Sequence, residues 1–211
     1  MNSNPSRPAR RRRTLLGVVI ALAMLLAAVV GIVAYRSAAA TTLPPADTGA
    51  AAVDETRDGA VTKVDGILPD AASPFDDDSP GIARLTPALL EALRRAATDA
   101  AEHGVDVRVN SGWRSAEYQE QLLHEAVTQY GSEAEAARWV ATPATSAHVA
   151  GEAVDIGPYA AADWMIAHGA GYGLCRTYDN EAWHFELRPD AVRDGCPPLY
   201  RDPTEDPRMQ R

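Results

Sequence analysis

The chain has 211 residues, with 20 Lys and Arg against 29 Asp and Glu, and its formal net charge is −9. This acidic balance excludes a nucleic-acid-binding protein, because phosphate contacts need a basic face. The length allows one domain of roughly 100–150 residues with a real hydrophobic core, and two cysteines are too few for a disulfide-rich miniature protein or a Cys₄ zinc module.

The amino-terminal end joins a basic tail to a long apolar segment. Residues 1–13 contain the run Arg10–Arg13, and residues 14–35 carry no charge. As a helix, these 22 residues would span about 33 Å, which matches the roughly 30 Å core of a bilayer. Basic residues on this side predict a cytoplasmic amino terminus, with the rest of the chain outside the membrane.

A cleaved signal peptide is the main alternative to a retained transmembrane anchor. Ser37–Ala40 offers small residues suited to cleavage, but the apolar run is longer than the 7–15 residues of a usual signal core, which favours the anchor. A buried helix of a soluble domain is disfavoured because no side of the segment is polar. We therefore expect a single-pass membrane protein whose working part lies outside the cytoplasm, or a secreted one if the segment is cleaved.

The next segment, residues 36–80, is rich in Ala, Pro, Asp, Gly and Thr and shows no sustained helical or strand period. This composition is typical of a disordered or extended tether, here with a short ordered end. All four tryptophans lie beyond it. The sequence thus predicts a folded domain over residues 81–211.

The first half of that domain is predicted to be mostly helical. Thr86 begins an amphipathic helix that stops at Gly104, and the alternating valines of residues 105–109 predict a half-buried strand. Ser115 caps a second helix, which ends near Gly131. A capping box, Ser-x-x-Glu at residues 132–135, predicts a third helix that contains Trp139 and Val140.

The second half is predicted to contain short strands around one helix. The strands cover residues 153–156, 174–178 and 183–187, and the helix covers residues 161–168. Helices and strands come in mixed order without regular alternation, which favours an α+β fold over a doubly wound parallel sheet. We expect a single small domain with a short central antiparallel sheet flanked by helices.

Two of the five histidines are candidates for chemistry. His103 and His168 lie at helix ends, where an imidazolium suits the helix dipole, and His124 lies on an exposed helix face. His148 and His184 instead each stand beside a carboxylate in a segment that contains Gly or Trp.

A catalytic zinc site needs three protein ligands, an open position for water and a separate carboxylate that takes the water's proton. His148, Asp155 and His184 can supply the ligands, and Glu181 can supply the base. Gly151 would let the backbone turn between the first two ligands. A buried His hydrogen-bonded to an Asp remains the structural alternative at this point.

Three segments carry a family resemblance. Ser-Gly-Trp-Arg-Ser at 111–115, Ser-x-His-x-x-Gly-x-Ala-x-Asp-Ile at 146–156 and Glu-x-Trp-His at 181–184 resemble the signature segments of the VanY-type D-alanyl-D-alanine carboxypeptidases, which are zinc peptidases of the cell wall. The resemblance spans about residues 108–188, and the three segments in this order are highly specific together.

The resemblance implies one Zn²⁺ per domain, held by His148, Asp155 and His184, with Glu181 as general base. It also implies that Arg114 lies near the scissile carbonyl, where its guanidinium can stabilise the oxyanion of a tetrahedral intermediate. A plain salt bridge to an acidic residue is the alternative for Arg114.

Four further positions match substrate-contacting or site-shaping residues of the family: Ser146, Ser115, Gln121 and Trp183. Helix capping explains Ser115 and helix solvation explains Gln121 nearly as well. Trp183 is expected to pack beside the metal and orient His184, although an ordinary core position fits it equally.

The two cysteines, Cys175 and Cys196, bracket the strand that carries His184. In an oxidising compartment we expect a disulfide between them. In the chain-entropy model, this bridge would stabilise the folded state by roughly 3 kcal/mol. Two buried free thiols are the alternative, and a zinc–thiolate site is disfavoured because neither cysteine has a Cys or His at ligand spacing.

The resemblance implies zinc-dependent hydrolysis of the terminal D-Ala-D-Ala bond of peptidoglycan stem peptides. The apolar segment at residues 14–35 predicts that this domain is held at the cell membrane. An endopeptidase of the same fold, or a wall-binding module without catalysis, remains the alternative. The intact pair of Glu181 and Arg114 disfavours the binding module, because a pure binding site needs no base beside an open metal.

Overall fold

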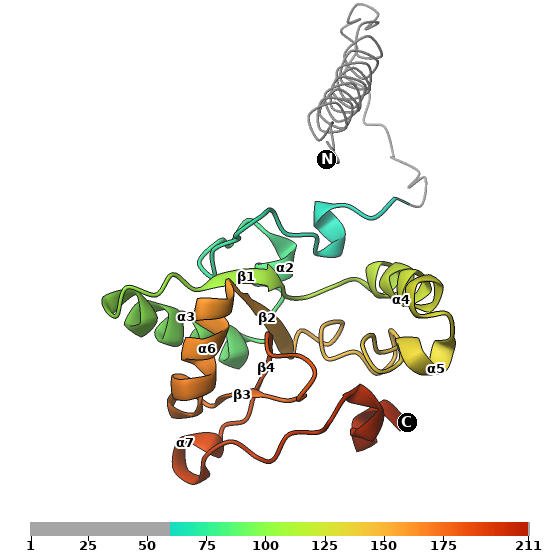
Figure 1. Cartoon of the computed structure of the whole chain (residues 1–211). Helices are drawn as coiled ribbons and strands as arrows, with labels where there is room; N and C mark the ends of the chain where they lie inside the picture. Colours follow the sequence, from blue (N-terminus) through green and yellow to red (C-terminus); the bar gives the residue numbers. More distant parts are fainter. Residues whose placement is uncertain (1–59, 211) are drawn as a thin grey trace, which may run out of the picture. The chain divides into compact units, whose positions relative to one another are not determined.

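The computed structural model describes residues 60–210 (Figure 1). The expected basic tail (1–13), membrane anchor (14–35) and most of the expected linker lie outside the described residues. Within residues 60–210, no helix is both long and apolar enough to cross a membrane.

Within the described residues, the strands form one four-stranded antiparallel sheet in the order β1-β2-β4-β3. The strands are β1 (Arg108–Ser111), β2 (Ala153–Gly157), β3 (Leu174–Arg176) and β4 (His184–Leu187). All three pairings are antiparallel, which confirms the expected α+β class and short central sheet.

Two helices cover one face of this sheet, α3 (Pro87–Glu102) and α6 (Tyr159–His168). The apolar stripe of α3 is buried, and it shares the core with Val154, Ile156 and Phe185 from the central strands. Because successive side chains of a strand point to opposite faces, Asp155 and His184 must point away from this core. The alternation of apolar and polar residues thus aims the candidate site residues at the opposite face.

Helices α4 (Ala116–Tyr130) and α5 (Glu133–Ala136) lie on the side of the sheet away from α3 and α6 (Figure 1). The Ser115 hydroxyl accepts a hydrogen bond of 3.0 Å from the backbone N–H of Tyr118, and Gly131 ends α4 in the left-handed conformation. Both predicted ends of this helix are confirmed.

The third predicted helix is shorter than expected. Ser132 caps it as predicted, accepting from the N–H of Glu135 at 3.2 Å, but α5 ends at Ala136 and does not contain Trp139 or Val140. Residues 137–139 continue in turns, with backbone hydrogen bonds from the N–H groups of Trp139 and Val140 to the carbonyl of Ala136.

The folded unit begins earlier than the expected boundary at residue 81. Residues 60–80 include the short helix η1 (Lys63–Asp65), and α2 (Pro80–Ala83) follows. Backbone hydrogen bonds tie this segment to the domain, from the N–H of Ser115 to the carbonyl of Asp65 at 2.8 Å and from that of Val109 to Ala72 at 2.9 Å. The part of the expected linker that is described is therefore ordered.

The strand expected over 105–109 begins three residues later than predicted, since β1 covers Arg108–Ser111. Val107 is nevertheless buried, so the alternation of valines correctly marked buried positions although hydrogen bonding to β2 starts only at Arg108. The buried positions thus begin before the hydrogen-bonded strand does.

The carboxyl-terminal part returns to the sheet after α7 (Ala191–Asp194) and contains the short helices η3 (Pro203–Glu205) and η4 (Pro207–Gln210). Cys175 on β3 is joined to Cys196, with their Cα atoms 5.6 Å apart. The predicted disulfide is confirmed, and the alternative of free thiols is excluded. We call residues 196–210, which follow this bridge, the carboxyl-terminal segment.

Candidate metal centre

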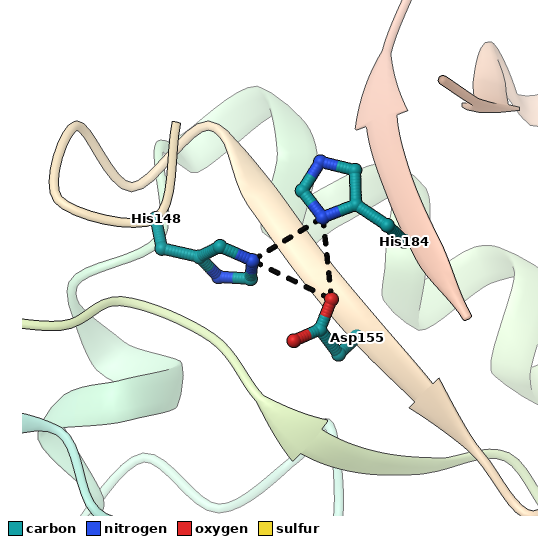
Figure 2. A group of neighbouring side chains, drawn as sticks. All are labelled: His148, Asp155 and His184. Atoms are coloured by element: carbon teal, nitrogen blue, oxygen red, sulfur yellow. Dashed lines mark hydrogen bonds and ion pairs between the residues drawn. The ribbon is translucent and has the colours of Figure 1, made fainter. Parts of the chain in front are cut away.

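His148, Asp155 and His184 meet in a tight buried cluster (Figure 2). Asp155 on β2 and His184 on β4 are directly paired across the two strands, and His148 comes from the loop before β2. His184 Nδ1 lies 3.3 Å from both Asp155 Oδ1 and His148 Nε2, and His148 Nε2 lies 3.4 Å from Asp155 Oδ1. Three ligand atoms therefore face one point.

The loop that carries His148 depends on a glycine. Gly151 has a φ of +72°, and a Cβ built there would lie 2.5 Å from the backbone oxygen of Arg84. Its N–H donates to the carbonyl of His148 at 3.0 Å, which closes a turn behind the ligand. The predicted role of Gly151 in turning the chain between His148 and Asp155 is confirmed.

The outer nitrogen of each imidazole has a partner that fixes the tautomer. His148 Nδ1 lies 2.8 Å from the carbonyl oxygen of Gly112, and His184 Nε2 lies 3.3 Å from a carboxylate oxygen of Glu186. Both oxygens are acceptors, so the outer nitrogens donate to them, and the inner nitrogen of each neutral ring can present a lone pair to the centre of the cluster. Without a cation, a proton on one inner nitrogen can be shared across the 3.3 Å between the two rings, and a bound cation would replace that proton.

The charges in the cluster also favour a cation. Burial raises the pKa of Asp155, but the two imidazoles and Arg114 outweigh it and hold the pKa well below its usual value. Burial lowers the pKa of His184, but hydrogen bonds to Asp155 and Glu186 outweigh burial and raise it to about 10. The field around His184 is thus strongly negative, and a divalent ion would compete with the proton for this position. Two imidazoles with one carboxylate form a donor set that fits zinc.

Glu181 lies against the same cluster and is 5% exposed. Burial is the largest cause that raises its pKa, to about 7, and the Asp155 charge adds to the effect. Its Oε2 lies 3.7 Å from His184 Nδ1, whereas its buried Oε1 has no hydrogen-bond partner among the described residues. A buried carboxylate with one unpaired oxygen beside a cation site is suited to accept a proton from a molecule bound there.

Arg114 reaches the cluster from the loop after β1. Its guanidinium donates to Asp155 Oδ2 at 3.0 Å, to Gln119 Oε1 at 3.1 Å and to Ser111 Oγ at 2.8 Å. The alternative role expected for Arg114, a salt bridge to an acidic residue, is therefore present. Its acidic partner is Asp155, which is itself a candidate metal ligand. By occupying Oδ2, Arg114 leaves Oδ1 of Asp155 to face the two imidazoles.

A cavity of about 370 Å³ opens onto this cluster, within the usual size range of small-molecule sites. His148, Asp155, His184, Glu181 and Arg114 all line it. A stacked aromatic pair, Tyr130 and Trp139, forms part of its wall with ring centroids 5.8 Å apart, and Pro203 and Met209 of the carboxyl-terminal segment form another part.

The four expected substrate positions divide into two pairs. Ser146 and Trp183 line the cavity, as expected. Ser115 and Gln121 do not line it: Ser115 caps α4, and Gln121 is exposed and donates to Glu125 at 2.8 Å. The expectation for Ser115 and Gln121 is therefore corrected, because their polar atoms are used by the helix itself.

The residue of α4 that reaches the site is Gln119, which the sequence interpretation missed. It is 1% exposed, accepts from Arg114 and donates to the carbonyl of Ala141 at 2.9 Å. Gln119 shares a helix face with Leu122 and Ala126, three and seven residues on, so a polar residue within an apolar stripe was the signal that could have identified it.

The other histidines serve as expected outside the site. His103 Nδ1 and His168 Nδ1 lie 2.8 and 2.9 Å from carbonyl oxygens four residues earlier, at the ends of α3 and α6. His124 is exposed on α4 beside Glu120. None of the three belongs to the metal-ligand group found among the described residues.

Several known proteins are similar to this chain. A curated relative, a D-alanyl-D-alanine carboxypeptidase of Enterococcus faecalis, is 32% identical over 127 residues, which cover 48% of this chain and 46% of that protein. The chain thus spans about half the length of the curated relative that it matches.

Two solved structures are among those to which this chain is similar. VanYB in complex with D-Ala-D-Ala is 26% identical with a TM-score of 0.49, covering 53% of this chain and 74% of that one. A mutant of the vancomycin resistance D,D-pentapeptidase VanY in complex with Zn(II) is 27% identical with a TM-score of 0.47, covering 49% and 72%.

The sequence profile of one family, described as VanY, D-alanyl-D-alanine carboxypeptidase, matches residues 82–190. This match covers half of the chain and includes the whole cluster, from Arg114 through His184. The chain belongs to the VanY family.

Proposed function

We propose that this protein is a zinc-dependent D,D-carboxypeptidase that removes the terminal D-alanine from peptidoglycan stem peptides. One observation carries the proposal: two imidazoles and a carboxylate present inward-facing ligand atoms beside a buried carboxylate oxygen of Glu181 that has no partner among the described residues. Membership of the VanY family and the name of the enterococcal relative support D-Ala-D-Ala as the substrate class.

The proposed roles follow from charge and position. Zinc, when bound, supplies Lewis-acid activation of water and of the peptide carbonyl. His148, Asp155 and His184 would hold the ion in a fixed orientation. Glu181 would accept the proton of the attacking water and pass it to the departing amine. Arg114, already fixed by Gln119 and Asp155, would donate hydrogen bonds to the oxyanion that forms at the carbonyl.

Hydrolysis by this route needs only the peptide and one water molecule as reactants. Water adds to the carbonyl carbon, the C–N bond breaks, the shortened peptide leaves with a new carboxylate, and free D-alanine leaves with the proton that Glu181 carried. Without a metal, burial raises the pKa of Glu181 to about 7. A bound cation would lower this pKa and favour the ionised carboxylate, which is the form that accepts a proton from water.

We also propose that residues 14–35 hold the protein in the cell membrane, with the catalytic domain outside the cytoplasm. The uncharged 22-residue run after four arginines supports this location, and the Cys175–Cys196 disulfide is consistent with an oxidising compartment. Fractionation of cells that make the full chain tests it: we expect the protein in the membrane fraction and accessible to external protease, and soluble cytoplasmic protein would contradict the proposal.

The activity is tested by incubating the protein with a stem pentapeptide that ends in D-Ala-D-Ala, with and without a chelator. We expect release of free D-alanine that stops when the chelator removes the metal and returns when Zn²⁺ is added back. Release of a different fragment would indicate an endopeptidase, and binding of the peptide without any cleavage would indicate a wall-binding module.

A further inference from the structure

We infer that Arg208, in the carboxyl-terminal segment, is a positioning residue that orients the metal ligand His184 through the carboxylate of Glu186. The inference rests on the metal centre of the proposed function. The family match ends at residue 190, so Arg208 lies outside the part of the chain that the family profile describes. The carboxyl-terminal segment would thus help to form the metal centre.

Glu186 is the link between the two residues. It follows His184 by two positions on β4, so both side chains point to the same face of the sheet. Glu186 Oε1 lies 3.3 Å from His184 Nε2, the nitrogen on the far side of the ring from the cluster. A carboxylate at this position fixes the tautomer and the ring angle of a histidine ligand.

Glu186 is 1% exposed, so its charge is far from water. A buried carboxylate is costly unless cations and hydrogen bonds compensate it. Two arginines do so: Arg188 Nη2 donates to Oε2 at 2.8 Å, and Arg208 donates to both oxygens, from Nη1 to Oε2 at 2.6 Å and from Nη2 to Oε1 at 3.0 Å.

These two arginines have different consequences for His184. Arg188 contacts only the oxygen of Glu186 that faces away from His184, whereas Arg208 also binds Oε1, the oxygen that faces His184 Nε2. A planar guanidinium bound to both oxygens fixes the plane of the carboxylate, which a single contact does not. Arg208 therefore sets the direction in which Oε1 points at the imidazole.

Arg208 is itself held in place. Its Nε donates to Asp206 Oδ2 at 3.0 Å, and Asp206 is fully buried. Asp206 also accepts from the Tyr178 hydroxyl at 3.0 Å, and the Tyr178 ring lies against His184 with the centroids 5.2 Å apart. The network thus contacts His184 twice, through the Glu186 carboxylate and through the Tyr178 ring. A shift of the carboxyl-terminal segment would therefore change both contacts.

The test compares Arg208→Ala and Arg208→Lys with a matched control, Arg201→Ala. Arg201 belongs to the same segment and carries the same charge, but its exposed guanidinium pairs with Asp202 and Glu205 and not with Glu186. Zinc affinity is measured by competition with a chromophoric chelator. We expect Arg208→Ala to bind Zn²⁺ about 10-fold more weakly, the low end for outer-shell partners of a metal ligand, with Arg208→Lys intermediate and Arg201→Ala within about 2-fold of the unaltered protein.

A second measurement does not depend on activity or on metal. Nitrogen-15 NMR of the metal-free protein reports which ring nitrogen of His184 carries the proton, and we expect Arg208→Ala to broaden or shift these signals while Arg201→Ala leaves them unchanged. If circular dichroism shows that Arg208→Ala does not fold, Arg208→Lys and Glu186→Gln take its place, and each is expected to bind Zn²⁺ more weakly than Arg201→Ala does.

The outcomes separate this inference from the proposed function. Unchanged zinc affinity and unchanged His184 signals in folded Arg208 variants would overturn the positioning role while leaving the carboxypeptidase proposal intact. Weakened zinc binding in a protein that releases no D-alanine would support the positioning role and contradict the proposed substrate. Failure of the unaltered protein to bind Zn²⁺ would overturn both.

Discussion

Asp155 and His184 are directly paired residues on the adjacent antiparallel strands β2 and β4, and their ligand atoms lie 3.3 Å apart. The hydrogen-bond register of two strands therefore fixes the distance between two metal-ligand candidates. A ligand pair held in this way needs little rearrangement to receive an ion, and the loop residue His148 completes the set.

The first prediction concerns the carboxylate of this pair. Asp155→Asn removes the negative charge that balances the ion and leaves Arg114 without its acid, so zinc affinity should fall by more than the roughly 10–100-fold typical of outer-shell changes. Chelator competition measures it. Asp163→Asn on the exposed side of α6 is the control, and equal affinity in both variants would contradict the assignment of Asp155.

The second prediction concerns Glu181. Glu181→Gln keeps the shape of the side chain but cannot accept a proton, so D-alanine release should fall by about 10²–10⁴-fold while zinc affinity stays within a few-fold. Turnover at saturating zinc is the measurement, with exposed Glu120→Gln on α4 as control. Near-normal hydrolysis by Glu181→Gln would rule out Glu181 as the general base.

The third prediction concerns Arg114. Arg114→Lys retains a positive charge but loses the fork that now binds Asp155 and Gln119 together, so kcat at saturating zinc should fall by about 10²–10³-fold, as for other lost oxyanion donors. Arg108→Lys, on β1 and paired with Asp106, serves as the control. Near-normal kcat at saturating zinc together with a reduced zinc affinity would show that Arg114 only supports Asp155.

The fourth prediction concerns the disulfide. It closes a loop over a sequence separation of 21 and fastens the start of the carboxyl-terminal segment to β3. Replacing Cys175 and Cys196 with alanine should lower the free energy of unfolding by about 3 kcal/mol in urea titrations. Reductant should destabilise the unaltered protein by a similar amount and leave the double variant unchanged; sensitivity of the double variant to reductant would point to another cause.

The fifth prediction concerns acid stability at Asp202, which is fully buried. Burial raises its pKa, but hydrogen bonds from Thr204 and Arg138 outweigh burial and hold the pKa below the usual 3.8. Because the folded-state pKa is depressed, the stabilisation is present above pH 3.8 and is lost as the pH falls through the lower, folded-state value.

Asp202→Asn should therefore cost about 1–3 kcal/mol of unfolding free energy at pH 7. The difference from the unaltered protein should shrink as the pH falls below 3.8 and through the lower pKa of the folded state. Urea titrations at several pH values measure it. A difference that stays constant down to acid pH would mean that the charge of Asp202 contributes nothing and that only its shape matters.

The sequence by itself predicted the class of fold, the helices α3 and α4 with their ends, the disulfide and the candidate metal ligands. The helices follow from local patterns of apolar periodicity and capping residues, and with two cysteines in the chain a single pairing was possible. The candidate ligands follow from residue types that suit a metal site and from the resemblance of three segments to the VanY-type carboxypeptidases. Such patterns are readable because neighbours along the chain are also neighbours in space, or because the chemistry of a metal site demands particular side chains.

The tertiary structure alone decided which polar residues reach the site. Gln119 and Gln121 lie two residues apart on one helix, and only the packing of α4 against the sheet turns Gln119 inward and leaves Gln121 in solvent. Arg208 is separated from Glu186 by 22 positions, and no local pattern in the sequence predicts their contact. Long-range packing chooses these partners, because the energy of a buried charge depends on what the fold brings to it and not on its neighbours in sequence.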